Sequence, residues 1–117
     1  MNMKPTADER TYHGFRDDEG TCHVRVAEPG DLIGRPLAPR LDLTNKSPTG
    51  FEWGYGGSGP AQLALALALC ADALGDDEAA LDLFQRFKFR VIGALPRDEP
   101  WTLTAAEVRR HCHELKR

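Results

Sequence analysis

Residues 51–74 read FEWGYGGSGPAQLALALALCADAL, an aromatic, glycine-rich loop that runs into a strongly apolar segment. Ten of the eleven residues 61–71 are apolar, all of them alanine, leucine or cysteine. The leucines recur at every second position, as in a strand. However, alanine and leucine are strong helix formers, and no β-branched residue interrupts the run. A helix that is apolar on all sides is buried in protein or membrane, and a membrane span needs about 20 apolar residues. This run ends at Asp72, so it predicts a central buried helix.

The ends of this helix carry recognisable signals. Pro60 suits the first turn, because its missing N–H would have no partner there and its φ is already helical. We expect Ser58 or Gly59 to cap the helix and Gln62 to reach back to a free N–H group. We expect Gly75 to end the helix in the left-handed conformation.

The loop at residues 54–59, GYGGSG, contains four glycines, which let a backbone approach a ligand closely. The free N–H groups and the positive dipole end of the following helix favour an anion. The pattern is nevertheless neither the phosphate-loop motif nor the dinucleotide-binding motif. Two interpretations follow: a tight entry into the helix, the commoner role of such loops, or a ligand site. The candidate site residues are Glu52, Trp53, Tyr55, Gly56, Gly57, Ser58 and Gly59.

Glu52 lies between two aromatic residues, so partial desolvation could shift its pKa. One interpretation makes it a carboxylate that contacts a ligand. The alternative, which we favour, makes it a structural partner for backbone N–H groups or for an arginine such as Arg40 or Arg90.

Three strings in this region, FEWGYGGSGPAQLALAL, LFQRFKFRVIGALP and WTLT, resemble a family of small uncharacterised proteins. That family occurs in bacterial and archaeal genomes and in their plasmids and phages. The resemblance is close over residues 51–104 and loose over the first fifty. It implies a domain of unknown function, encoded by a mobile element, and it implies no catalytic residue.

The remaining chain predicts a small α+β fold. Strands are expected at residues 10–16 and 21–27, joined by a hairpin loop that ends in Gly20. Residues 40–43 could add a third strand and residues 51–53 a brief one. We therefore expect an antiparallel sheet of two to four strands packed on three helices, the central one buried.

Two more helices carry clear start signals. Asp76 is a plausible N-cap for an amphipathic helix whose apolar stripe extends to Leu95. Thr104 and Glu107 form a capping box in front of a helix at residues 105–115. Phe89 lies off the apolar stripe, so it either packs against another element, which we favour, or is exposed at a contact surface, where it could support a homodimer.

Composition narrows the class of protein. The chain has 117 residues, 28% of them charged and 41% apolar, which is typical of a globular protein. We expect residues 1–9 to form a flexible tail and residues 10–117 a single domain. The N-terminus lacks an apolar signal core and the three cysteines show no repeated spacing, which predicts a cytoplasmic protein with free thiols. The net charge of −3 gives no general attraction to nucleic acid or anionic membrane.

No catalytic or metal-binding set is visible. The sequence His111-Cys112-His113 invites a zinc hypothesis, but adjacent helical residues diverge by about 100° and the usual ligand spacing is absent. We therefore expect no metal and no cofactor. The leading hypothesis is a non-enzymatic binding protein that recognises a small anionic ligand or a protein surface at the glycine-rich loop. The second is a nucleic-acid-associated protein that uses the basic residues of the last two helices: Arg86, Lys88, Arg90, Arg109 and Arg110. An enzyme is the third and weakest hypothesis.

Overall fold

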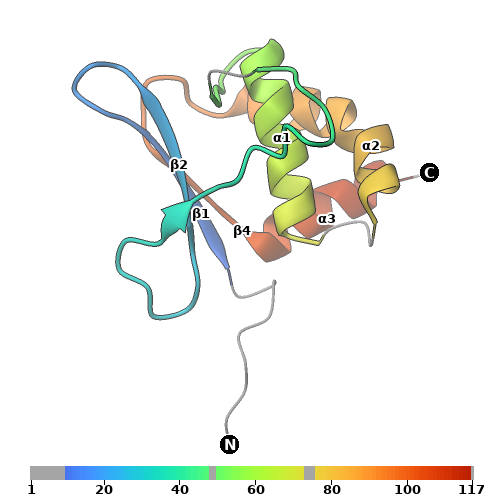
Figure 1. Ribbon diagram of the computed structural model, residues 1–117, viewed down its shortest axis with the longest axis horizontal. Coiled ribbons are helices and arrows are strands. Elements are labelled where there is room, and N and C mark those ends of the chain that lie inside the picture. The colour runs from blue at the N-terminus through green and yellow to red at the C-terminus, as the bar shows by residue number, and fades with distance from the viewer. Residues whose placement is uncertain (1–9, 48–49, 73–75, 117) are drawn as a thin grey trace, which may run out of the picture.

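A computed structural model describes residues 10–47, 50–72 and 76–116, and the predicted tail at residues 1–9 lies outside these ranges. A four-stranded antiparallel sheet stands on one side of the molecule and three helices on the other (Figure 1). The predicted α+β class is therefore confirmed. The sheet order is β3-β2-β1-β4. The strands are β1 (Thr11–Arg16), β2 (Cys22–Ala27), β3 (Arg35–Pro36) and β4 (Trp101–Thr104).

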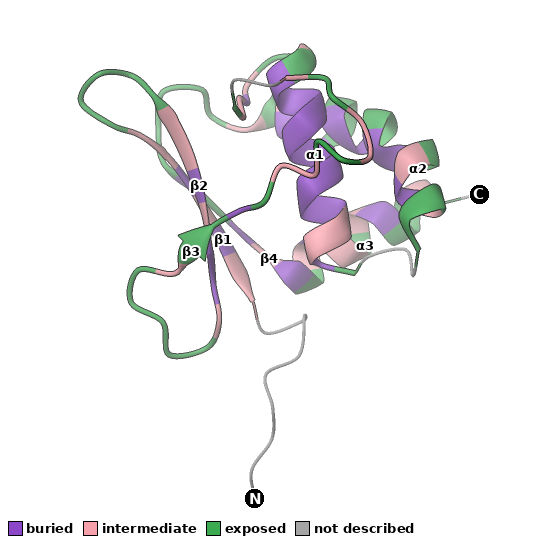
Figure 2. Cartoon of the chain, viewed as in Figure 1, coloured by how far each residue is buried: buried purple, intermediate pink, exposed green. Residues whose placement is uncertain are grey.

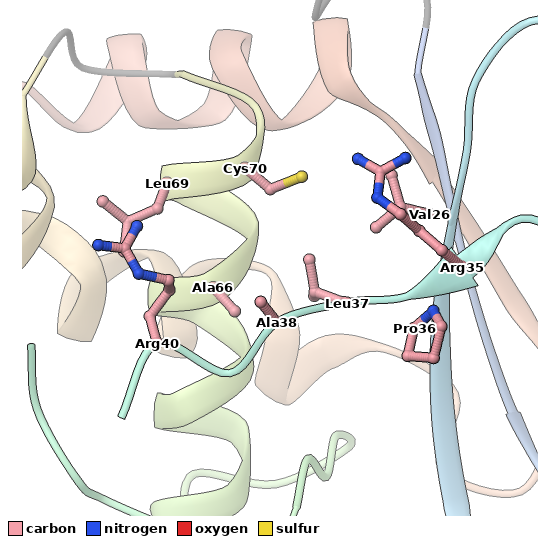
Figure 3. Close-up of a pocket in the computed structure, with 9 residues that line it drawn as sticks. All are labelled: Val26, Arg35, Pro36, Leu37, Ala38, Arg40, Ala66, Leu69 and Cys70. Atoms are coloured by element: carbon pink, nitrogen blue, oxygen red, sulfur yellow. The ribbon is translucent and has the colours of Figure 1, made fainter. Parts of the chain in front are cut away.

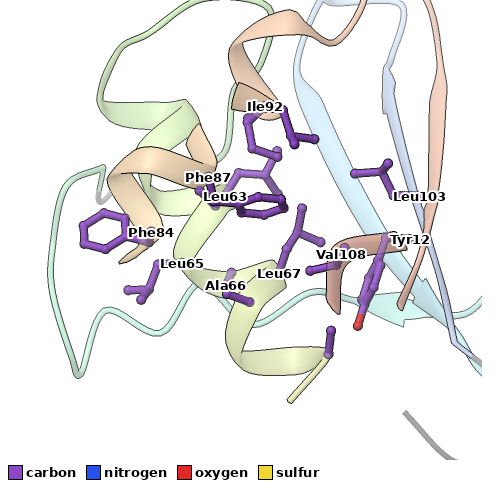
Figure 4. Packing of buried hydrophobic residues seen from close by; sticks show 14 of the residues in the cluster. Tyr12, Leu63, Leu65, Ala66, Leu67, Phe84, Phe87, Ile92, Leu103 and Val108 are labelled. Atoms are coloured by element: carbon purple, nitrogen blue, oxygen red, sulfur yellow. The ribbon is translucent and has the colours of Figure 1, made fainter. Parts of the chain in front are cut away.

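The central helix, α1 (Ser58–Cys70), lies between the sheet and α2 (Asp77–Arg90), as Figure 1 shows. It is buried along most of its length (Figure 2), with Leu63, Leu65 and Leu67 all completely inaccessible to solvent. Figure 4 shows the reason: some of these leucines point to α2 and others to the sheet and to α3 (Ala105–Leu115). Leucines at every second position point to different sides of a helix, and α1 has neighbours on several sides that bury them.

The β1–β2 hairpin forms as predicted. The Asp17 carboxylate accepts hydrogen bonds from the backbone N–H groups of Glu19 and Thr21, each at 2.9 Å. Gly20 takes φ of +84°, a conformation that glycine adopts without steric cost.

The third and fourth strands differ from the prediction. Residues 40–43 form a turn rather than a strand, because Arg40 adopts φ of +61°, and residues 51–53 are not a strand either. The third strand is β3, only two residues long. β4 was missed, because its four residues are too few for a pattern of alternation. It is recognisable only beside β1, where Trp101 packs across Gly14 so closely that any side chain at Gly14 would collide with the indole ring.

The start of α1 also departs from the prediction. Gly57, not Ser58 or Gly59, is the N-cap, without a side-chain cap, while Pro60 does lie in the first turn. Gln62 does not reach back to the helix start, because its side chain is fully buried and binds the segment at residues 39–47 instead. Gly75 lies outside the described residues.

The other two helix starts are confirmed. The Asp76 carboxylate accepts from the Ala79 N–H at 2.6 Å, and Thr104 and Glu107 form the reciprocal capping box. α2 ends at Arg90 rather than near Leu95, because the chain continues as a short 3-10 turn, η2 (Ile92–Ala94). Within the described residues, no helix is long and apolar enough to cross a membrane.

Candidate functional site

Glu52 is an arginine-bound carboxylate at the start of α1. Arg16, the last residue of β1, donates to it twice, from Nη2 to Oε1 at 2.8 Å and from Nη1 to Oε2 at 3.1 Å. The Glu52 side chain rests on Gly59, where an added Cβ would lie 2.6 Å from the Glu52 Cβ. The hydrogen bond from Arg16 holds the pKa of Glu52 below its ordinary value, and the same bond raises the pKa of Arg16.

The structural interpretation of Glu52 is thus supported, but both suggested arginines were wrong. Arg40 binds Asp42 and Asp77, and Arg90 binds Glu114. No local pattern indicates Arg16, since it lies 36 residues before Glu52 and reaches it only because the hairpin folds beside the loop.

Trp53 belongs to the core and not to an exposed face. Its ring is fully buried and meets Trp101 edge-on at a centroid distance of 5.3 Å. The guanidinium of Arg16 lies 5.2 Å from the ring centroid. Trp53 is therefore no platform for a ligand, and it anchors the loop to the sheet.

Two exposed rings from separate elements pack on successive residues of the loop. Tyr55 in the loop is 41% exposed and Phe89 on α2 is 67% exposed. An added Cβ on Gly56 would be 3.0 Å from Phe89 Cε1, and one on Gly57 would collide with Tyr55 Cε2. The favoured prediction for Phe89, packing against another element, holds only at Gly56 of the loop, and most of the side chain is exposed because α2 directs position 89 away from the stripe that faces α1.

A cation lies on the face of each ring. The Arg97 guanidinium is 5.2 Å from the centroid of Tyr55, and Lys88 Nζ is 4.1 Å from the centroid of Phe89. We call these residues, Tyr55, Gly56 and Phe89 with Lys88 and Arg97, the Tyr55–Phe89 surface. The chain approaches closely here: Gly54 takes φ of +83°, and an added Cβ would collide with Arg97.

An open hollow of about 350 Å³ lies beside the same loop, between it and the end of the β1–β2 hairpin at residues 20–22. We call it the Cys22 hollow. Of the seven candidate site residues, Glu52, Tyr55, Ser58 and Gly59 line it, Trp53 is buried in the core, and Gly56 and Gly57 are not in its lining. Burial, and then Glu52, raise the pKa of the Cys22 thiol to about 11. The hollow is therefore walled by a carboxylate and a protonated thiol.

This arrangement offers little chemistry for catalysis. A thiol with a raised pKa is a poor nucleophile, and Arg16, its nearest cation, is already bound to Glu52 and to the Arg97 carbonyl. Among the described residues, no group of three or more histidine, cysteine or acidic side chains could hold a metal ion.

The five basic residues of the nucleic-acid hypothesis do not form one face. Arg86 donates to the Leu115 carbonyl at 3.1 Å, and Arg90 is paired with Glu114. Lys88 lies on another side of α2, largely buried against Phe89. On α3, Arg110 is exposed, whereas Arg109 makes contacts of its own.

The structure also exposes apolar residues that no sequence pattern had singled out. Leu32 and Ile33 stand at the tip of the β2–β3 connection, and both are largely exposed. Arg25 fixes this connection by donating to the carbonyls of Ile33 and Gly34 at 3.0 and 2.8 Å. The β2–β3 connection lies away from the loop before α1 (Figure 1).

Comparison with known proteins gives a family but no function. No curated protein and no solved structure matches the chain. A family model matches residues 12–114, which span the sheet and all three helices. The chain therefore belongs to DUF6166, a family of unknown function.

Proposed function

We propose that this chain is a non-enzymatic binding protein whose Tyr55–Phe89 surface binds an acidic segment of a partner protein. The observation that carries the proposal is the pair of exposed rings, each with a cation on its face. Aromatic residues and arginine are enriched at protein interfaces and dominate their binding energy. A partner segment with apolar and acidic side chains would cover the rings and meet Lys88 and Arg97.

The electrostatics favour a protein partner over a small anion at the loop. An anion in the Cys22 hollow would face the Glu52 carboxylate, and Arg16 is already engaged by Glu52. The first-turn N–H groups of α1 attract anions, but the Glu52 side chain rests on that turn at Gly59. A small anionic ligand in the Cys22 hollow, which Ser58 also lines, is therefore only the second candidate.

A homodimer through the same surface is less well matched. Around a twofold axis the surface meets itself, which brings like charges of Lys88 and Arg97 together. The nucleic-acid hypothesis is weakened because Arg86 and Arg90 are already bound to the end of α3. A role in a mobile element and a cytoplasmic location stay predictions from the sequence.

A peptide selection tests the proposal directly. A random peptide library is selected on the immobilised protein, and the affinities of enriched peptides are measured for wild type, Phe89→Ser and Ile33→Ser. Ile33→Ser is the matched control, because it also removes an exposed apolar side chain, but in the β2–β3 connection rather than on α2. We expect acidic peptides with apolar residues, with affinity lowered about tenfold or more by Phe89→Ser and unchanged by Ile33→Ser.

Added salt should weaken the binding of these peptides, since Arg97 is exposed and salt screens its attraction to an acidic segment. Peptides that bind Phe89→Ser and wild type equally would refute the proposal, as would a selection without enrichment. The second candidate is tested in parallel by thermal shift with nucleotides and inorganic phosphate. A ligand at 100 times its Kd adds about 2.7 kcal/mol of apparent stability. A shift that Ser58→Ala removes and Phe89→Ser keeps would transfer the function to the Cys22 hollow.

A further inference from the structure

A separate pocket lies between α1 and the segment that leaves β3, on the side of α1 that faces the sheet (Figure 3). Its volume is about 230 Å³. Val26 and Leu37 line it from the sheet side, and Ala66 and Leu69 line it from α1. Arg35 and Arg40 stand at its two ends, and the Cys70 side chain points into it (Figure 3). We call it the Arg35 pocket.

The charge at the Arg35 end is unbalanced. One carboxylate, that of Glu28, receives both Arg10 at 2.9 Å and Arg35 at 2.8 Å. Two guanidinium groups therefore share a single negative charge. Arg35 donates to Glu28 from Nη1, no other described residue accepts from its side chain, and half of that side chain is exposed.

The Arg40 end is balanced. Its guanidinium is bound by Asp42 at 3.1 Å and lies 3.6 Å from Asp77. No carboxylate belongs to the lining of the pocket itself. An incoming anion would therefore be drawn to Arg35, which can bind a carboxylate with two parallel hydrogen bonds.

We infer that the Arg35 pocket binds a small organic carboxylate. Its charged group lies against Arg35, and its short apolar remainder lies along Leu37, Ala66 and Leu69. The pocket is smaller than the ~300 Å³ lower limit of sites for drug-sized ligands, which indicates a compact molecule. This inference is independent of the Tyr55–Phe89 surface, which uses other residues.

The three cysteines provide a test in the unmodified chain. Cys70 lines the Arg35 pocket, Cys22 lines the Cys22 hollow, and Cys112 is fully buried. The probes are iodoacetate, a small carboxylate, and iodoacetamide, its neutral analogue. In either reaction the thiolate sulfur forms a bond to the methylene carbon, iodide leaves with the electron pair, and the thiol proton passes to water. Peptide mass spectrometry then gives the rate at each cysteine.

We expect iodoacetate to alkylate Cys70 faster than iodoacetamide does, with a rate that saturates as iodoacetate is increased. Butyrate should slow this reaction and butyramide should not. Arg35→Gln should lower the iodoacetate rate at Cys70 about tenfold, the effect of losing a charge-assisted hydrogen bond, and leave the iodoacetamide rate unchanged. Arg35→Lys keeps the positive charge but loses the planar guanidinium that can bind a carboxylate with two hydrogen bonds. Its iodoacetate rate at Cys70 should therefore lie between those of wild type and Arg35→Gln.

Cys22 is the internal control. It lies beside both the Glu52 carboxylate and the Arg16 guanidinium, which donates to its sulfur at 2.7 Å; these charges offset each other, so Cys22 should show no preference for iodoacetate. Labelling of Cys112 would reveal a variant that has unfolded, which separates a folding defect from loss of the site. A Cys70 that prefers iodoacetamide in wild type, or an iodoacetate rate that Arg35→Gln leaves unchanged, would overturn the inference. Equal protection by butyrate and butyramide would overturn it as well.

Discussion

Gln62 is a fully buried polar side chain in the centre of α1, and Gln62→Leu tests what it does there. Its Oε1 accepts from the N–H groups of Lys46 and Ser47 at 2.8 and 3.2 Å. Its Nε2 donates to the carbonyls of Pro39 and Thr44 at 2.6 and 3.1 Å. Gln62 thus supplies partners for four backbone groups in the irregular segment that connects β3 to the loop before α1.

The expected cost follows from these four hydrogen bonds. At about 1 kcal/mol each, their loss costs about 4 kcal/mol, because the backbone groups remain without partners. The leucine side chain recovers about 1 kcal/mol through added apolar burial, which leaves a net loss of about 3 kcal/mol. For a chain of 117 residues, unfolding entropy is about 0.25 kcal/mol per kelvin, so Tm should fall by about 12 °C.

Urea and thermal unfolding followed by circular dichroism measure this loss. Gln85→Leu is the matched control, because Gln85 is exposed on α2 and makes none of these bonds, so its change should stay within about 0.5 kcal/mol. A loss below about 1 kcal/mol in Gln62→Leu would contradict the role assigned to Gln62. An equal loss of stability in both variants would show that the glutamine-to-leucine change itself, and not the loss of the four hydrogen bonds of Gln62, is responsible.

Three further predictions concern the loop and the core. Arg16→Gln should cost about 1 kcal/mol at neutral pH, because it breaks a partly exposed ion pair with Glu52. The folded-state pKa of Glu52 lies below its ordinary 4.5, so this contribution to stability is present above pH 4.5 and is lost as pH falls through the folded-state pKa. The urea unfolding curves of wild type and Arg16→Gln should therefore converge in acid, and curves that stay apart would contradict the prediction. Gly59→Ala should destabilise the fold by about 1–3 kcal/mol, because the new Cβ meets the Cβ and backbone of Glu52. Gly57→Ala displaces only an exposed tyrosine ring and should cost less than about 1 kcal/mol. Equal losses of stability in urea unfolding would refute this difference. Cys112 is fully buried, and burial raises its pKa to about 12. A thiol-specific disulfide reagent should therefore label it no faster than the chain unfolds. Faster labelling in a stopped-flow or mass-spectrometric assay would refute its burial.

The predictions that held were those that depend on neighbours in the chain. The composition of α1, the Asp76 cap and the capping box of Thr104 and Glu107 all act within one helix, so the sequence displays both partners. The hairpin around Gly20 is equally local. The candidate residues of the loop before α1 divide between the hollow, the core and an exposed surface.

The errors concern partners that are distant in the chain. Arg16 was missed as the partner of Glu52 because nothing in the sequence places the end of β1 beside residue 52. β4 was missed because its register exists only against β1. The Arg35 pocket could not be predicted either, since its walls come from β2, the β3 segment and the end of α1.

A buried, alanine- and leucine-rich helix behind a glycine loop can be predicted from the chain alone, because helix propensity, caps and tight turns are properties of adjacent residues. The fold decided that Trp53 is core while Tyr55 and Phe89 form a surface. It also decided which arginine neutralises which carboxylate and that Gln62 clamps the segment at residues 39–47. The physical reason is that burial and ion pairing depend on distances in space between elements, which a local sequence pattern does not contain.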